Sequence, residues 1–341
     1  AAARRDVLHR LREGEIDILV GTHAVLSEDV TFQSLAVAII DEQHRFGVHQ
    51  RATLRRSEDD DVPHQLVMTA TPIPRTLAIS YYGDLDVSTI HGRLPGRSPI
   101  ATRHVTSDEA GAVYAELAER VGRGEQGYVV VPVIDESESL LKDIGTHLQD
   151  LQQGPLADCT LAALHGRMHA SERDEIMHRY RAGDIDVLVA TTVIEVGIDV
   201  PNATMIVIEQ AERFGLAQLH QLRGRVGRGD QPGVCVLVSD PVTEDATARL
   251  DAIVGTDDGF QIAQADLDIR GPGEFLGARQ SGLAPFKVAD FQRDYELLRM
   301  AQRDAAEWIE RDPDLSSDEH ALLRRRLLKR FREAVGLVDV G

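Results

Sequence analysis

Two adjacent carboxylates, Asp41 and Glu42, directly follow an apolar run at residues 36–40 that has the composition of a buried strand. In open α/β sheets, functional side chains gather beyond the carboxyl ends of the strands. An acid at that point can hold the water shell of a magnesium ion on nucleotide phosphates, and a second acid can orient the attacking water. The pair, continued by Gln43 and His44, therefore predicts a phosphoryl-transfer site. A solvated strand end is the plainer alternative.

Hydroxyl residues and one arginine follow two further strand-like runs, at 65–68 and 187–190: Thr69, Thr71, Arg75, Thr191 and Thr192. Threonine hydroxyls at strand ends suit phosphate contacts and can couple a nucleotide site to a nucleic-acid site. A proline-rich turn and an ordinary strand-to-loop transition are the alternatives for these two segments.

The most specific pattern is QLHQLRGRVGRG at residues 218–229, which contains Gln221, Arg225 and Arg228. Arginines separated by glycines can place guanidinium groups where the charge of a transferring phosphate must be neutralised. The glycines do not fit a dinucleotide fingerprint, because no strand runs directly into them. A solvated basic turn is the remaining alternative.

Alternating strand and helix patterns must position these motifs. Continuous apolar runs predict parallel strands buried on both faces of a sheet, at 16–20, 36–40, 65–68, 127–134, 159–164, 187–190, 205–209 and 234–239. Helices are predicted at 137–151 and 171–182, the second with its amino-terminal cap near Ser171, and helical periodicity continues from residue 244. The sequence therefore predicts an α/β protein with parts at 1–92, 93–243 and 244–341.

Residues 13–22 also resemble residues 181–192, since each segment predicts a helix end, a tight turn and a strand that ends in Thr. Two related lobes explain this repeat.

Composition sets the outer limits. The 341 residues carry a formal charge of -19, yet basic residues cluster locally, at 51–56, 223–228, 270–279 and 324–332. A local basic track can bind DNA on an acidic protein. Cys159 and Cys235 lie in apolar runs and are expected to pack in the core. No apolar run approaches the roughly 20 residues that a membrane helix needs, so no membrane contact is expected. The chain opens at Ala1 without a signal peptide, which predicts a fragment of a cytoplasmic protein.

Four motifs together resemble those of superfamily-two helicases: DEQHRFG at 41–47, TATPIPRTLA at 69–78, ATTVIEVGIDVP at 190–201, and the arginine motif at 218–229. They are similar to helicase motifs II, III, V and VI. In detail the chain resembles the RecG family, whose motif II has the form DEQH. The related transcription-repair coupling factors usually show DEEQRFG, so His44 disfavours them.

The resemblance implies two RecA-like P-loop NTPase lobes with parallel sheets, the first one truncated, and a C-terminal helical hairpin appendage. ATP and Mg²⁺ are the implied cofactors, branched or duplex DNA is the implied partner, and a monomer is the expected state. Asp41 and Glu42 would serve magnesium and water activation, and Gln221, Arg225 and Arg228 would face the nucleotide. The remaining implied residues are Gly197 and Asp199 near the nucleotide and its ribose, and Arg270, Arg279 and Gln280 in DNA translocation.

One family motif does not occur. The sequence contains no G-x-x-x-x-G-K-[ST] loop, which in the family precedes motif II and grips the nucleotide phosphates. We expect the chain to begin partway through the first lobe, to bind ATP weakly and to expose an uncovered apolar sheet face. A non-catalytic DNA-binding module derived from a helicase is the alternative from another class. The intact carboxylates and arginines oppose that alternative.

Overall fold

The computed structural model describes residues 2–27, 29–42, 63–69, 86–90, 92, 99–132, 139–191, 200–270 and 293–338. The chain divides into two compact units, one formed by residues 1–87 and 272–341 and the other by residues 88–271. None of the helices in the described ranges is long and apolar enough to cross a membrane.

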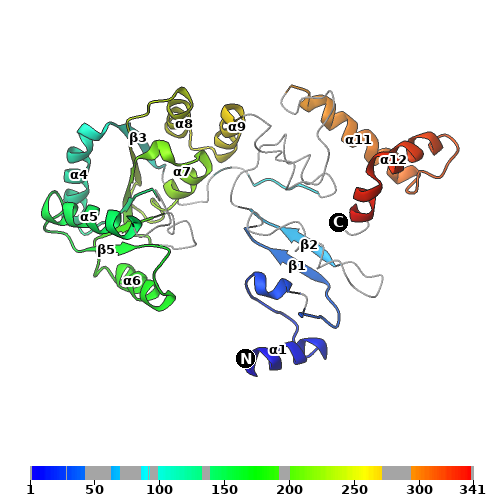
Figure 1. Cartoon of the computed structure of the whole chain (residues 1–341), viewed down its shortest axis with the longest axis horizontal. Coiled ribbons are helices and arrows are strands. Elements are labelled where there is room, and N and C mark those ends of the chain that lie inside the picture. Colours follow the sequence, from blue (N-terminus) through cyan, green and yellow to red (C-terminus); the bar gives the residue numbers. More distant parts are fainter. Residues whose placement is uncertain are drawn as a thin grey trace. The chain divides into compact units, whose positions relative to one another are not determined.

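The second unit contains a parallel sheet of six described strands in the order β3-β8-β7-β4-β6-β5 (Figure 1). The strands are β3 (Ala101–Val105), β4 (Gln126–Val130), β5 (Leu161–Leu164), β6 (Val187–Ala190), β7 (Ala203–Glu209) and β8 (Val234–Val238). Every pairing in this sheet is parallel. The predicted α/β class with parallel sheets is thereby confirmed.

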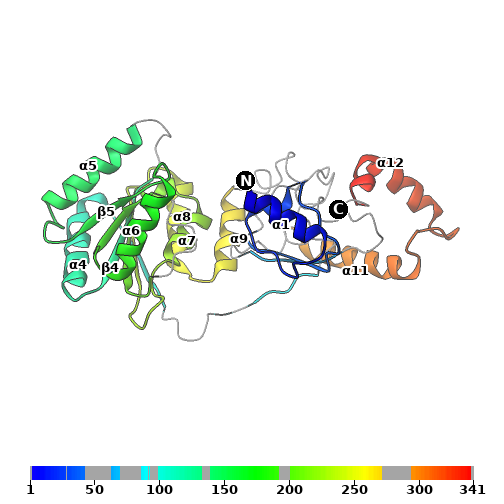
Figure 2. The same cartoon turned by 90° about the horizontal axis from the view of Figure 1, so that it is seen from below.

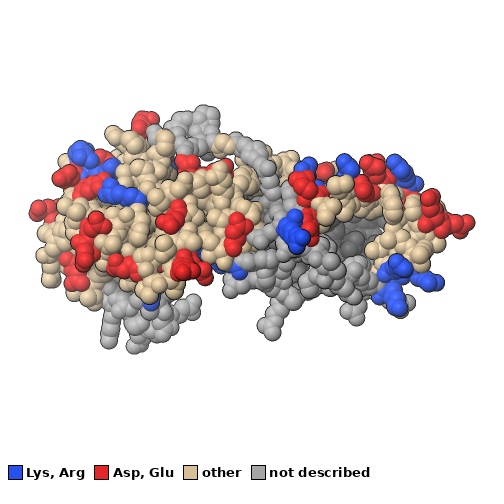
Figure 3. Space-filling model, turned by 90° about the horizontal axis from the view of Figure 1, so that it is seen from above, with Lys and Arg blue, Asp and Glu red and all other residues tan. Residues whose placement is uncertain are grey.

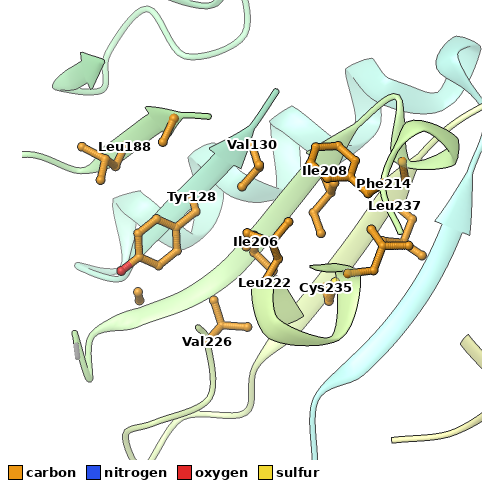
Figure 4. Packing of buried hydrophobic residues seen from close by; sticks show 14 of the residues in the cluster. Tyr128, Val130, Leu188, Ile206, Ile208, Phe214, Leu222, Val226, Cys235 and Leu237 are labelled. Atoms are coloured by element: carbon orange, nitrogen blue, oxygen red, sulfur yellow. The ribbon is translucent and has the colours of Figure 1, made fainter. Parts of the chain in front are cut away.

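Helices cover both faces of this sheet (Figures 1 and 2). The helices are α4 (Ala110–Gly122), α5 (Ser139–Gln153), α6 (Ala170–Ala182), α7 (Leu216–Arg223), α8 (Glu244–Gly255) and α9 (Gly259–Arg270). Successive strand residues alternate between two cores, because their side chains point to opposite faces. Tyr128 and Ile206 pack with residues of α6 to α9 (Figure 4), whereas Val129 and Val207 pack with residues of α4 and α5. The prediction of a sheet buried on both faces is confirmed for this unit.

The first unit contains α1 (Ala2–Arg12), the 3₁₀ turn η1 (His23–Leu26) and the parallel pair β1 (Val37–Ile40) and β2 (His64–Val67). In β1, Ala38 and Ile40 are buried, but Val37 and Ile39 are 54% and 64% exposed. Burial on both faces is therefore wrong for β1, and the expected uncovered apolar face is present. Helices α11 (Tyr295–Arg311) and α12 (Ala321–Val338) also belong to this unit.

Two local predictions were wrong. Residues 16–20 form no strand, and Ile18 and Val20 are 80% and 88% exposed, because this run has no strand partner within the described residues. Helix α6 begins at Ala170 with His169 as its cap, so Ser171 lies inside the helix. As expected, Cys235 is fully buried, and Cys159, although half-buried, packs against the core beside α4 and α5.

The repeat between the two units appears in the helix ends. Gly14 (φ 69°) and Gly183 (φ 85°) end α1 and α6 in the left-handed conformation. In each case the glycine N–H donates to the carbonyl three residues back, and the next N–H donates to the carbonyl five residues back. This is a glycine-based helix stop that a side chain at the same φ would strain.

Candidate nucleotide and DNA site

The carboxylates Asp41 and Glu42 lie at the carboxyl edge of the β1–β2 pair. The register aligns Ile40 with Val67, and the N–H of Met68 donates to the carbonyl of Ile40 at 2.8 Å. Thr69 therefore follows β2 at the same edge at which the acids follow β1. The structure brings together the first residues of the first two motifs, as parallel strands require.

Glu42 has an unusual backbone. Its φ is 53°, in the left-handed region that non-glycine residues seldom adopt, and its N–H donates to Oδ1 of Asp41 at 2.9 Å. Such strain is common at functional sites. Asp41 is exposed and Glu42 is half-buried. A solvent-facing carboxylate beside a fixed second acid suits a magnesium ion held through water.

The arginine motif starts on α7, whose Leu216, Leu219 and Leu222 are fully buried against the sheet. The loop that follows α7 packs against the residues that precede β3, β7 and β8. A Cβ atom placed on Gly229 would lie 2.5 Å from the carbonyl oxygen of Pro201, just before β7. The expectation that all motifs lie at carboxyl ends of strands is therefore wrong for this one, because α7 runs back across the sheet and delivers the loop to the amino-terminal edge.

Gly227 fixes the shape of this loop. Its φ is 69°, and an added Cβ atom would lie 3.2 Å from Cγ1 of Ile100 and 3.5 Å from the backbone of Gly233. A side chain at Gly233 would meet the Gly227 nitrogen at 2.9 Å. The two backbones thus approach so closely, just before β3 and β8, that neither position has room for a side chain.

The arginines of the motif do different work. Arg223 is 2% exposed, and its Nη1 donates to the carbonyls of Ile253 and Thr256, each at 2.8 Å, at the end of α8. Its Nη2 donates to Nδ1 of His220 at 3.0 Å. Burial, and to a smaller extent the positive charge of Arg223, lowers the pKa of His220 to about 4, so this imidazole is a neutral acceptor at pH 7. Arg223 is a structural clamp that the sequence pattern alone did not separate from its neighbours.

Arg225 and Arg228, by contrast, are only half-buried, as is Gln221. Nε of Arg228 donates to the carbonyl of Gly224 at 3.1 Å, which holds the side chain along the loop. These three residues, predicted to face a nucleotide, thus lie on α7 and its loop at one edge of the sheet.

Two residues predicted for DNA binding and coupling lie at the opposite, carboxyl edge. Thr191 follows β6, is 1% exposed, and its N–H donates to the carbonyl of Leu164 at 3.2 Å. Arg270 ends α9, and its Nε donates to Oδ1 of the buried Asp266 at 2.9 Å. Its Nη2 would lie 2.7 Å from a Cβ atom placed on Gly215, the residue that caps α7.

Helix α7 therefore links the two edges. It has eight residues and is therefore about 12 Å long at 1.5 Å per residue. Arg270 packs at its start, and Arg225 and Arg228, which are predicted to face a nucleotide, follow its end. Sequence reasoning missed Gly215 and Asp266. The spacing of Asp266 and Arg270, four residues apart on a helix, was the available signal.

The other predicted site residues lie outside the described residues: Gln43, His44, Thr71, Arg75, Thr192, Gly197, Asp199, Arg279 and Gln280. No cluster of three or more metal-ligating side chains occurs in the described part of the chain. A single carboxylate that binds through water does not require such a cluster.

Three family models match the chain. The DEAD/DEAH box helicase model covers residues 1–79, and the helicase conserved C-terminal domain model covers residues 110–230. The model of domain 3, C-terminal, of the ATP-dependent DNA helicase RecG covers residues 256–337.

Similar curated proteins carry one description. The "ATP-dependent DNA helicase RecG" of Bacillus subtilis is 46% identical over 330 residues, which are 96% of this chain and 48% of that protein. The protein of the same description from Synechocystis is 45% identical over 338 residues, 98% of this chain and 40% of that protein. The chain thus spans about half the length of the curated relatives that it matches.

Two solved structures are also similar to this chain. "Structure of RecG bound to three-way DNA junction" has a TM-score of 0.66 and 45% sequence identity, and the match covers 87% of this chain and 38% of that one. The helicase MrfA bound to DNA and AMPPNP has a TM-score of 0.50 and 18% identity, with 89% of this chain and 50% of that chain covered, and so shows a shared fold alone.

Proposed function

Because the chain belongs to the RecG family of superfamily-two helicases, we propose that it supplies motor elements of an ATP-dependent DNA helicase that unwinds or remodels branched DNA, such as stalled forks and Holliday junctions, in recombination and repair. The observation that carries this proposal is the 46% identity over 330 residues to the Bacillus subtilis relative. The match extends past the helicase domains into the RecG-specific region at 256–337.

In the proposed mechanism, a magnesium ion bound with ATP would supply positive charge to neutralise the charge that develops on the phosphates. Asp41 would hold the ion through water, and Glu42 would orient the attacking water. The exposed Asp41 and the strained, half-buried Glu42 at the β1 edge support these roles. Gln43 and His44 complete the same motif in sequence.

The second unit carries the other residues that we propose for nucleotide contact. Arg225 and Arg228 would stabilise the transferred phosphoryl group, beside Gln221, and Gly197 and Asp199 would lie near the nucleotide and its ribose. Arginine suits this role because its planar guanidinium binds phosphate oxygens in pairs. The half-buried, glycine-shaped loop after α7 supports this assignment, since it fixes the side chains without sealing them.

DNA contact and coupling would fall to residues at the other edge: Thr69, Thr71, Arg75, Thr191, Thr192, Arg270, Arg279 and Gln280. The packing of Arg270 at the start of α7 supports the coupling role, because any movement of the arginine loop at the end of α7 is transmitted along a short rigid helix. We further propose three parts, at 1–92, 93–243 and 244–341, and action as a monomer.

The test is unwinding of a labelled three-way DNA junction by a protein that carries this chain behind a G-x-x-x-x-G-K-[ST] segment. We expect ATP-dependent strand separation. Arg270→Gln should retain most ATP hydrolysis but lose unwinding at least tenfold, whereas Arg249→Gln, on the neighbouring helix α8, should retain both activities. Unwinding that needs no ATP, or no unwinding when ATP is present, would contradict the proposal.

A further inference from the structure

Helix α12 begins with a group of cations that no motif discussed above uses. We call Arg325, Arg326 and Lys329 the α12 basic patch. All three side chains are exposed. Arg325 and Arg326 lie four and three residues before Lys329, so the three side chains share one face of the helix, from which Arg324 points at least about 100° away. The sequence from 321 to 332 contains no Asp or Glu. The patch is thus a concentrated positive surface on a chain with a formal charge of -19.

Helix α11 shows how this protein treats ordinary surface arginines. Each described arginine within α11 has a carboxylate partner: Arg299 with Glu296 at 3.7 Å, Arg303 with Asp304 at 3.4 Å, and Arg311 with Glu307 at 3.5 Å. In the part of the chain that the structure describes, no carboxylate forms an ion pair with any cation of the α12 basic patch. Figure 3 shows acidic side chains near basic ones on the described residues of the face in view.

Local stability does not explain the patch. Like charges one turn apart on a helix repel each other. Cations stabilise a helix near its carboxyl end, whereas these lie in the first half of α12. An unpaired, self-repelling group of cations is stabilised when an anionic partner binds it, and its arginines pair well with phosphate oxygens.

The exposed apolar residues distinguish between anionic partners. Leu322, Leu327 and Leu328 are 56%, 36% and 42% exposed. Relative to Leu322, the other two point about 140° and about 120° away in opposite senses around the helix, given 3.6 residues per turn. Leu322 therefore lies on the face of the patch, and Arg324 lies between Leu327 and Leu328 on the other side. These charged and apolar side chains do not separate into the two faces that a helix lying on a membrane needs.

We propose that the α12 basic patch binds the phosphate backbone of DNA, as a contact separate from Thr191 and Arg270. This inference rests on the proposed function, because it takes DNA as the substrate. Backbone binding of this kind depends on charge and not on base sequence, so the patch would strengthen binding to duplex and branched DNA alike.

The experiment compares two variants that lose the same charge. The patch variant is Arg325→Gln, Arg326→Gln, Lys329→Gln. The control variant is Arg299→Gln, Arg303→Gln, Arg311→Gln. Binding of each chain to a fluorescent 30-base-pair duplex is measured by anisotropy across a series of KCl concentrations, and far-UV circular dichroism checks that helix content is retained.

Each phosphate contact that is lost should flatten the plot of log K against log [salt] by about 0.9. We expect the slope of the patch variant to fall by about 2.7, and that of the control variant by less than about 1. Equal changes in both variants would show a net-charge effect and overturn the proposal. An unchanged slope together with lost binding to anionic vesicles, or to an acidic polypeptide, would overturn it in favour of that partner.

The same measurements distinguish the proposed DNA substrate from the proposed role of the α12 basic patch. Absence of DNA binding by the unchanged chain would contradict both the proposed DNA substrate and the patch. DNA binding by the unchanged chain with the same slope in the patch variant would contradict the patch alone.

Discussion

Replacement of Arg223 by Met should destabilise the second unit while leaving Arg225 and Arg228 unchanged. The substitution removes two hydrogen bonds from a charged donor, to the carbonyls of Ile253 and Thr256, and leaves both carbonyls unsatisfied beside a buried aliphatic chain. A hydrogen bond to a charged group contributes about 1.5 to 3 kcal/mol. Since Met retains much of the packing, we expect a net loss of about 3 to 4 kcal/mol, a large share of a typical domain's stability.

Two assays should report this loss. The urea midpoint of the second unit should fall by about 1.5 to 2 M, for a slope of about 2 kcal/mol per molar. Amide exchange should rise most in α8, whose last turn the guanidinium holds. The exposed Arg213 gives the matched control, because Arg213→Met removes the same charge and should cost less than about 0.5 kcal/mol. A cost below about 1 kcal/mol for Arg223→Met, with unchanged exchange in α8, would refute the clamp.

Three further predictions concern the same unit. Gly227→Ala should destabilise it by about 1 to 3 kcal/mol in urea unfolding, because φ is positive and the added Cβ atom has tight contacts, whereas Gly145→Ala in α5, with open space around it, should stabilise by about 0.5 to 1 kcal/mol. His220 has a pKa of about 4 in the folded state, so the unfolded state binds its proton first as the pH falls. The free energy of unfolding should therefore fall as the pH drops from about 6.5 toward 4, by at most about 3 kcal/mol. His220→Asn should reduce this pH dependence. Thiol titration of the native chain should modify the half-buried Cys159 and leave Cys235 unreacted, since burial raises its pKa to about 12; rapid reaction of both would contradict the packing of β8.

The central strands were predictable because burial on both faces of a sheet requires every residue to be apolar. Val187–Ala190 and Val234–Val238 are continuous apolar runs, and each is buried on both faces. The edge strand Ala101–Val105 was missed, since its ATRHV sequence is largely exposed and lacks a core signal. Conversely, residues 16–20 have the composition of a buried strand but no strand partner in the described residues. Composition records suitability for burial, and pairing decides whether burial occurs.

The candidate site was predictable in its residue types but not in its geometry. Spacing pointed to Arg223, Arg225 and Arg228 alike, because all three share one glycine-arginine pattern, and the resemblance to helicases singled out Arg225 and Arg228. Neither gave a means to recognise Arg223 as a buried clamp. The placement of the arginine loop at the amino-terminal edge depends on the direction in which α7 crosses the sheet. That direction follows from the packing of its three leucines and not from the motif itself.

The most direct test of the central claim is DNA-stimulated ATP hydrolysis by a protein in which this chain follows a G-x-x-x-x-G-K-[ST] segment. This protein is compared with its Glu42→Gln variant and with its Asp17→Asn variant, a control in which an exposed side chain is changed. The account predicts hydrolysis that DNA stimulates, a loss of at least a hundredfold with Glu42→Gln, and no change with Asp17→Asn. Hydrolysis that Glu42→Gln leaves intact, or no hydrolysis in a folded protein that still binds DNA, would contradict the account and favour a non-catalytic DNA-binding module.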